Sequence, residues 1–204
     1  MEDITFIIKT FERVECVNRL VKSILVMYPD AIILIGDDSR VSCNVFFEKN
    51  YPKKNVKIYD LPFDSGLSYG RNYLLDRIKT DYFVLLDDDF VFDKDTDLES
   101  GLMILKSENL DIIGGFFRNS SAVYKPTDYL KVATQELFHL QKPYNYIGTL
   151  NLDEANRILN ANFITNEFPE FAITDITHNF FIGKTDIIRE RNRWDDELKI
   201  NEHT

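Results

Sequence analysis

The feature that most constrains the fold of this chain is a fourfold alternation of short apolar segments with helical patterns. The apolar segments cover residues 4–8, 31–35, 56–59 and 82–86. Apolar residues recur at helical spacing between them, most clearly over residues 14–25 and 66–78. Apolar runs of this length are typical of parallel strands that helices cover on both sides. We therefore predict an α/β fold with a mostly parallel central sheet and helices on both faces.

The alternation continues to about residue 117 and then weakens. Thr96 and Glu99 have the spacing of a capping box, which predicts a helix over residues 96–106, and a strand follows over residues 111–117. Residues 118–204 carry aromatic and turn residues without a clear period, and no repeat or linker separates them from the rest. We predict one domain over residues 1–204, in which residues 118–204 complete what residues 1–117 begin.

Charge and cysteine content argue against several classes of function. With a formal net charge of −10, most of the surface repels a phosphate backbone, so we expect no general nucleic-acid binding. The chain has 2 cysteines without the spacing of a metal or redox motif, and we expect reduced thiols and a cytoplasmic protein. No apolar run approaches the roughly 20 residues that span a bilayer, and we expect neither a signal peptide nor a transmembrane segment.

Three consecutive carboxylates, Asp87, Asp88 and Asp89, follow the apolar segment that ends at residue 86. At an effective dielectric of about 20 and a separation of roughly 5 Å, each pair repels by about 3 kcal/mol, so a cation is expected among them. A hard divalent metal suits carboxylate oxygens. If the strand continues, Asp87 and Asp89 project to the same side and Asp88 to the other. The alternative is a solvated acidic turn.

Polar residues also follow the first three apolar segments. Lys9 and Thr10 follow the first, Asp37 and Asp38 the second, and Arg71 lies at the start of the helix after the third. The carboxyl ends of parallel strands line one crevice, so we expect these groups to face a common site. There the helix dipole and the Arg71 guanidinium could meet an anion, although the glycine spacing is neither a Walker nor a Rossmann pattern. The alternatives are a turn or helix cap for the Asp pair and a surface helix start for Arg71.

Taken together, these segments resemble a GT-A glycosyltransferase of the family 2 type. The resemblance rests on KTFER (9–13), DDS (37–39), SG with GRN (65–66 and 70–72) and LLDDDFVF (85–92), in that order. The chain is similar in particular to the β-1,4-N-acetylgalactosaminyltransferases that build gangliosides, through DIIGG (111–115), NFF (179–181) and KTD (184–186). The resemblance covers nearly the whole chain.

The resemblance implies a GT-A fold, with a nucleotide-sugar-binding half over residues 1–117 and an acceptor-side half over residues 118–204 that is truncated at its C-terminus. It implies inverting transfer of a sugar, a HexNAc in particular, from a UDP-sugar to a glycan or lipid-linked saccharide. Asp89 and Asp87 would bind Mn²⁺ or Mg²⁺ between the two phosphates. The donor would be held by Thr10, Asp37, Asp38, Arg71, Asp87 and Asp88.

Inversion needs a general base opposite the leaving group. Family 2 enzymes commonly supply it from a Glu-Asp pair, and the matching residues here are Glu202 and His203. His203 is a candidate base or metal ligand, since the ordinary pKa of histidine is about 6.5. Asp175, His178 and Asn179 would border the acceptor or the donor sugar.

Three alternatives stay open from the sequence. The chain could be a catalytically inactive nucleotide-sugar-binding module. It could be a metal-dependent phosphatase that uses Asp87 and Asp89, although that motif belongs after a first strand. A receiver-type phosphoacceptor domain is disfavoured by the chain length and by the triple Asp. For the transferase, we expect a cytoplasmic enzyme, with peripheral association at the inner membrane face as a variant.

Overall fold

The computed structural model describes residues 3–51, 55–115, 148–153, 156, 158–163, 173–175 and 177–197. The chain divides into two compact units, residues 1–114 with 179–204, and residues 115–178. Each unit is described by itself. The prediction of one domain with halves 1–117 and 118–204 stays a prediction.

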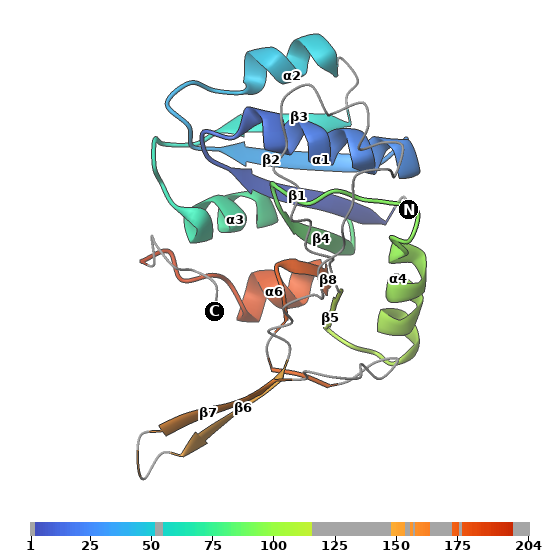
Figure 1. Cartoon of the computed structure of the whole chain (residues 1–204), viewed down its shortest axis with the longest axis vertical. Helices are drawn as coiled ribbons and strands as arrows, with labels where there is room; N and C mark the ends of the chain where they lie inside the picture. The colour runs from blue at the N-terminus through green and yellow to red at the C-terminus, as the bar shows by residue number, and fades with distance from the viewer. Residues whose placement is uncertain are drawn as a thin grey trace, which may run out of the picture. The chain divides into compact units, whose positions relative to one another are not determined.

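A sheet in the order β3-β2-β1-β4-β8-β5 forms the centre of the first unit (Figure 1). Neighbouring strands among β1 to β4 pair in parallel, whereas β8 runs antiparallel to both β4 and β5. The strands are β1 (Ile4–Thr10), β2 (Ile32–Asp37), β3 (Val56–Asp60), β4 (Tyr82–Asp87), β5 (Ile112–Gly114) and β8 (Phe180–Lys184). The predicted mostly parallel α/β sheet is confirmed.

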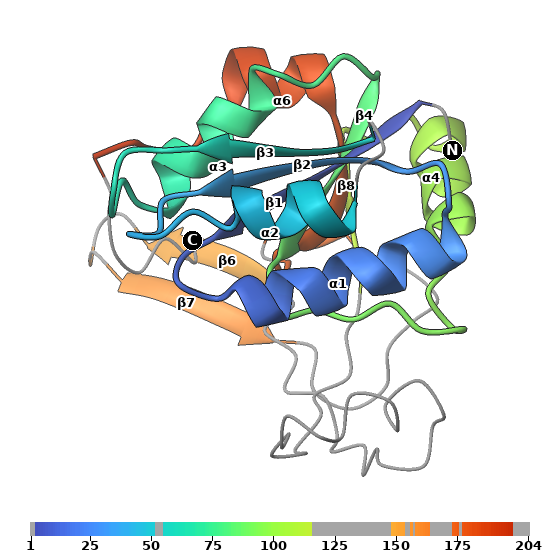
Figure 2. The ribbon, with the colours of Figure 1, turned by 90° about the horizontal axis from the view of Figure 1, so that it is seen from above.

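Helices cover both faces of this sheet. Two clusters of buried apolar residues, one on each face, show which helices pack on which side. One cluster joins Phe6 and Ile8 of β1 to α1 (Val14–Met27), α2 (Asn44–Asn50) and α4 (Leu98–Ser107). The other joins Ile7 to α3 (Leu67–Leu75) and α6 (Thr185–Arg191). Figure 2 shows α3 and α6 on the opposite side of the sheet from α1. Every residue of β1 is buried, which agrees with the mainly apolar segment over residues 4–8.

Several predicted boundaries differ from the structure. The helix expected over residues 66–78 ends at Leu75, and the strand expected over residues 111–117 is β5, which ends at Gly114; residues 116 and 117 lie outside the described residues. The capping residue of α4 is Asp97, whose carboxylate accepts the amide of Ser100 at 2.9 Å. The prediction that Thr96 caps this helix is wrong. Its hydroxyl accepts the Asp93 amide in the preceding turn, at 3.1 Å.

In the second unit, β6 (Gly148–Asp153) and β7 (Ile158–Phe163) form an antiparallel pair. The Asp153 carboxylate accepts the backbone amide of Asn156 at 3.1 Å in the connection between them. Among the helices that the structure describes in either unit, none has the length and apolar character needed to cross a membrane.

Candidate active site

The carboxyl ends of β1, β2 and β4 meet at one edge of the sheet. In the strand register, Thr10 pairs with Asp37 of β2 and Lys9 pairs with Asp87 of β4. The structure therefore brings the acidic turn after β4 next to the ends of β1 and β2, where the sequence predicts a common site. The hydrogen bonds and ion pairs of these residues determine which of their side chains are accessible to a ligand.

The acidic turn is organised by Asp88, which points into the protein. Its Oδ2 accepts the Thr10 hydroxyl at 2.7 Å, and its Oδ1 pairs with Nη1 of Arg13 at 2.9 Å. Asp89 is half exposed and its Oδ2 pairs with Nη2 of the same guanidinium, also at 2.9 Å. The premise that the strand continues is wrong, since β4 ends at Asp87 and the next two residues form a turn. Thr10 is also buried, and its predicted role in donor binding stays a prediction.

Burial raises the pKa of Asp88 to about 6, against the lowering effects of the Thr10 hydrogen bond and the Arg13 charge. The unfolded carboxyl releases its proton near pH 3.9. Between about pH 4 and pH 6 the Asp88 carboxyl is protonated more often in the folded protein than in the unfolded chain. Protonation of Asp88 therefore stabilises the fold fully below about pH 4, and this stabilisation is lost as the pH rises through 6.

The Asp88→Asn protein should therefore show a different dependence of stability on pH. We expect the free energy of unfolding of the wild type, relative to that of this variant, to fall by about 3 kcal/mol between pH 4 and pH 7. Urea denaturation at several pH values in EDTA measures the difference. Two profiles that stay parallel over this range would show that Asp88 does not titrate as its burial implies.

Arg71 lies under the site and pairs with Asp87. Its Nη2 donates to Asp87 Oδ1 at 3.1 Å, and the guanidinium carbon lies 5.6 Å from the ring centroid of Trp194. Asn179 Nδ2 donates to the other oxygen, Asp87 Oδ2, at 3.2 Å. The side chain of Arg71 is 2% exposed, so the alternative of a surface helix start is wrong. In this arrangement Arg71 holds Asp87, and a direct role for Arg71 in binding an anion stays a prediction.

Asn72, the next residue of α3, holds the segment that covers Arg71. Its amide group donates to the Trp194 carbonyl at 2.7 Å and accepts the Trp194 amide at 3.1 Å. It also donates to Asp196 at 2.6 Å. These bonds fix Trp194 above the guanidinium. The pairing joins residues more than 120 positions apart, so no local pattern could reveal it.

Lys9 and Asp38 form an ion pair with both side chains almost fully buried. Lys9 also donates to the Thr10 carbonyl at 3.0 Å, while Asp38 accepts the Gly66 amide at 3.1 Å. A Cβ on Gly70 would lie 2.4 Å from Cδ of Lys9, so α3 can pass this close only with glycine at that position. Asp38 thus ties β1 and β2 to the start of α3, and it is 1% exposed.

Asp37 is also buried, and it organises the segment that leads to α2. Its carboxylate accepts the Ser39 amide at 2.9 Å and the Cys43 amide at 2.7 Å. Burial alone would raise the pKa of Asp37, but the hydrogen bonds from Ser39 and Cys43 outweigh it and hold that pKa below its ordinary value. These contacts correspond to the alternative of a turn or cap residue. A direct role for Asp37 in ligand binding stays a prediction.

Two exposed aromatic rings at the same edge were missed by the sequence analysis. Phe11 follows β1 and Phe63 follows β3, with their ring centroids 5.9 Å apart and exposed fractions of 38% and 53%. The Arg40 guanidinium, which follows β2, lies 5.1 Å from the Phe63 centroid. Such a pair can stack a planar ligand. The available signal was their position directly after apolar strands.

The carboxylates can hold a divalent metal only as part of a shared site. Asp87 and Asp89 offer oxygen donors, and their side chains are 31% and 48% exposed. No group of three or more His, Cys, Asp or Glu residues gathers around one point in the described parts of the chain. Two carboxylates fit Mg²⁺ or Mn²⁺ when phosphate oxygens and water complete the shell. Repulsion among the three carboxylates is smaller than the sequence suggests, because Arg13 pairs with Asp88 and Asp89 while Arg71 pairs with Asp87.

The remaining predicted residues lie elsewhere. Asp175 and His178 belong to the second unit, where Asp175 accepts the Leu150 amide at 2.8 Å. Glu202 and His203 lie outside the described residues. Their predicted roles in acceptor binding and proton transfer stay predictions.

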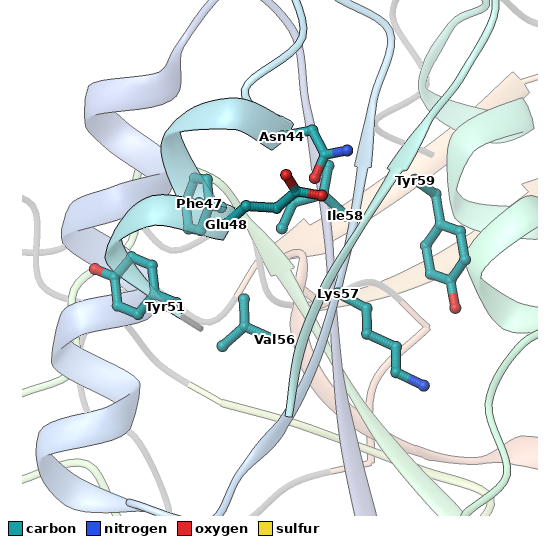
Figure 3. Close-up of a pocket in the computed structure, with 8 residues that line it drawn as sticks. All are labelled: Asn44, Phe47, Glu48, Tyr51, Val56, Lys57, Ile58 and Tyr59. Carbon is teal, nitrogen blue, oxygen red and sulfur yellow. The ribbon is translucent and has the colours of Figure 1, made fainter. Parts of the chain in front are cut away.

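A groove of about 480 Å³ lies between α2 and the edge strand β3 (Figure 3). Its lining includes Phe47, Glu48 and Tyr51 on the helical side and Lys57 and Tyr59 on the strand. It contains none of the residues gathered at the strand ends, so the candidate site is the sheet edge described above.

The chain belongs to glycosyl transferase family 2, whose model matches residues 5–188. A human protein, beta-1,4 N-acetylgalactosaminyltransferase 1, is 31% identical over 191 residues, which cover 92% of this chain and 32% of that protein. The chain thus spans about a third of the length of the curated relatives it matches. Family membership leaves the phosphatase and receiver alternatives without support.

Solved structures show the same fold at low sequence identity. The crystal structure of S. aureus TarS 1-349 in complex with UDP-GlcNAc aligns with a TM-score of 0.62 and 15% identity, over 98% of this chain and 51% of that one. The mannosyltransferase PcManGT from Pyrobaculum calidifontis, in complex with GDP-Man and Mn²⁺, aligns with a TM-score of 0.60 and 12% identity, over 96% and 48%. The chain therefore has the GT-A fold.

Proposed function

We propose that this chain is an inverting, metal-dependent glycosyltransferase that moves a HexNAc from a UDP-sugar to a glycan or lipid-linked saccharide. The observation that carries the proposal is the sheet edge at which an acidic turn with two accessible carboxylates, Asp87 and Asp89, lies at the ends of the same strands as an exposed aromatic pair. The name of the human relative and the UDP-GlcNAc in the TarS complex support a HexNAc donor.

In this proposal the uracil ring of the UDP-sugar stacks on Phe11 and Phe63, and the diphosphate of the donor extends toward Asp87 and Asp89. The buried residues act from below. Thr10 holds Asp88, Arg71 holds Asp87, and Asp37 and Asp38 support the loops that carry Arg40 and the start of α3. We assign donor-binding or supporting roles to Thr10, Asp37, Asp38, Arg71, Asp87 and Asp88.

The chemistry requires a leaving group and a base. A divalent metal held by Asp89, Asp87 and the diphosphate would neutralise the charge that grows on the departing UDP, without proton transfer. Arg71 and Asn179 orient Asp87 for this role through their bonds to its two oxygens. Glu202 or His203 would accept the proton of the acceptor hydroxyl. We place the acceptor side in residues 118–204.

We further propose that the enzyme works in the cytoplasm, at the membrane face when its acceptor is lipid-linked. Both cysteines, Cys16 and Cys43, are free thiols, which agrees with a reducing compartment.

Removal of the Phe11 ring should weaken the binding of UDP. We expect Phe11→Ala to raise the Kd of UDP about tenfold, because stacking of one base on an aromatic ring contributes about 1–3 kcal/mol. Calorimetric titration of UDP measures the change. Phe46→Ala is the matched control, since Phe46 is 39% exposed on α2 and packs against Phe47 of the same helix. Equal UDP affinity in both variants would remove Phe11 from the site.

The activity itself is tested by release of UDP from UDP-GalNAc, UDP-GlcNAc, UDP-Glc and UDP-Gal, with saccharide acceptors, in Mn²⁺ or in EDTA. We expect release that depends on Mn²⁺ and is fastest with a UDP-HexNAc. UDP binding without any turnover would favour the inactive sugar-nucleotide-binding module. Turnover that continues in EDTA would contradict the metal-dependent mechanism.

A further inference from the structure

Arg13 pairs with Asp89, the carboxylate of the acidic turn that the proposed function assigns to a metal ion. Its two terminal nitrogens bridge Asp88 and Asp89, each at 2.9 Å, and its side chain is 47% exposed. Charge-assisted bonds of this length satisfy the carboxylate oxygens that they reach. One guanidinium therefore pairs with both carboxylates that follow β4, and this group of three side chains keeps a net charge of about −1 when both carboxylates are ionised.

The backbone next to Arg13 is anchored, whereas the half-exposed Arg13 side chain has freedom to turn toward solvent. Glu12 donates its amide to Ser39 and accepts the Arg40 amide at 3.0 Å, which anchors the residue before Arg13 to the loop after β2. Arg13 itself stands at the N-cap position of α1. Arg71 has no such freedom, because it is buried against Asp87 and Trp194.

We propose that Arg13 is an exchangeable counter-cation: it holds Asp89 when no metal is bound, and a divalent metal binds Asp89 only by displacing Nη2 of Arg13. The inference rests on the proposed function, which makes Asp89 a metal ligand. The buried Asp88 retains Nη1 during the exchange, so the guanidinium pivots on one bond and stays beside the site. Like charges at this distance repel, so the metal binds weakly until a diphosphate adds its negative charge.

The exchange is tested by titrating Mn²⁺ into the full chain without nucleotide. The EPR signal of free Mn²⁺ reports how much of the ion is bound. We expect Arg13→Met to bind Mn²⁺ about tenfold more tightly than the wild type. Arg13→Lys should also bind more tightly, by a smaller factor, because a lysine keeps the charge but cannot bridge two carboxylates. Arg193→Met is the matched control, since Arg193 is 39% exposed and pairs with Asp76 instead. It should stay within about twofold of the wild type.

Two results would overturn the exchange. One is an Arg13→Met protein that binds Mn²⁺ no more tightly than Arg193→Met does. The other is an Arg13→Lys protein that matches the wild type, because then only net charge would count. A parallel titration with UDP and Asp89→Asn separates this inference from the proposed function. If Asp89→Asn retains UDP-dependent Mn²⁺ binding, the metal site itself is wrong; if it loses that binding while Arg13→Met matches the wild type, only the exchange is wrong.

Discussion

Replacement of Asp89 with asparagine is expected to lower the rate of sugar transfer by about 100- to 1,000-fold. In the proposed mechanism this carboxylate holds the metal that stabilises the departing diphosphate, a contribution of several kcal/mol, and each 1.4 kcal/mol corresponds to about tenfold in rate. Thermal stability should hardly change, because the Asp89 side chain is 48% exposed and exposed ion pairs contribute about 0–1 kcal/mol. The loss is measured as UDP release in saturating Mn²⁺.

Asp186→Asn is the matched control for this experiment. Asp186 is an exposed carboxylate that also pairs with an arginine, Arg189 at 3.0 Å, and it lies on α6 in the same unit. We expect full activity in this variant. An Asp89→Asn protein that retains more than about a tenth of the wild-type rate would show that Asp89 is not the metal ligand on which transfer depends.

Replacement of Lys9 with methionine is expected to lower the free energy of unfolding by about 3–5 kcal/mol. The Lys9 and Asp38 side chains are 5% and 2% exposed, so the substitution leaves a buried carboxylate without its cation. The amide of Gly66 and the hydroxyl of Ser65 remain as partners of Asp38, but neutral donors do not replace an ammonium group. Urea denaturation followed by circular dichroism measures the loss.

Two further variants separate this buried pair from ordinary charge effects. Lys106→Met removes an exposed lysine whose distance to Asp3 is 3.8 Å, and it should change stability by less than about 1 kcal/mol. The double variant Lys9→Met with Asp38→Asn should recover part of the loss, because no unpaired charge is left buried. A Lys9→Met protein as stable as Lys106→Met would contradict the account of the pair.

The parallel part of the fold could be predicted because its signals are local. Strands β1, β2 and β4 are largely buried and therefore appear as apolar runs, and the helices between the strands show their own period. The antiparallel course of β8 could not be predicted in this way. It depends on pairing with β4 and β5, which lie about 65 to 100 residues earlier in the chain, and its short apolar run carries no sign of direction.

The gathering of the candidate residues at one sheet edge could also be predicted, but their accessibility could not. Acidic residues after buried strands mark the sheet edge, and the strand register places them together. Whether Arg71 or Asp38 meets solvent depends on Trp194 and Lys9, which come from distant positions in the chain. Arg13 was overlooked as a partner of the turn because 76 residues separate it from Asp89.

The most direct test of the central claim is a calorimetric titration of UDP into the chain, with Mn²⁺ and with EDTA. The site described here predicts binding that requires Mn²⁺ in the wild type and is lost in Asp89→Asn. UDP binding of equal strength in EDTA, or no binding in either condition, would contradict the assignment of the sheet edge around Asp87 and Asp89 as a metal-dependent nucleotide-sugar site.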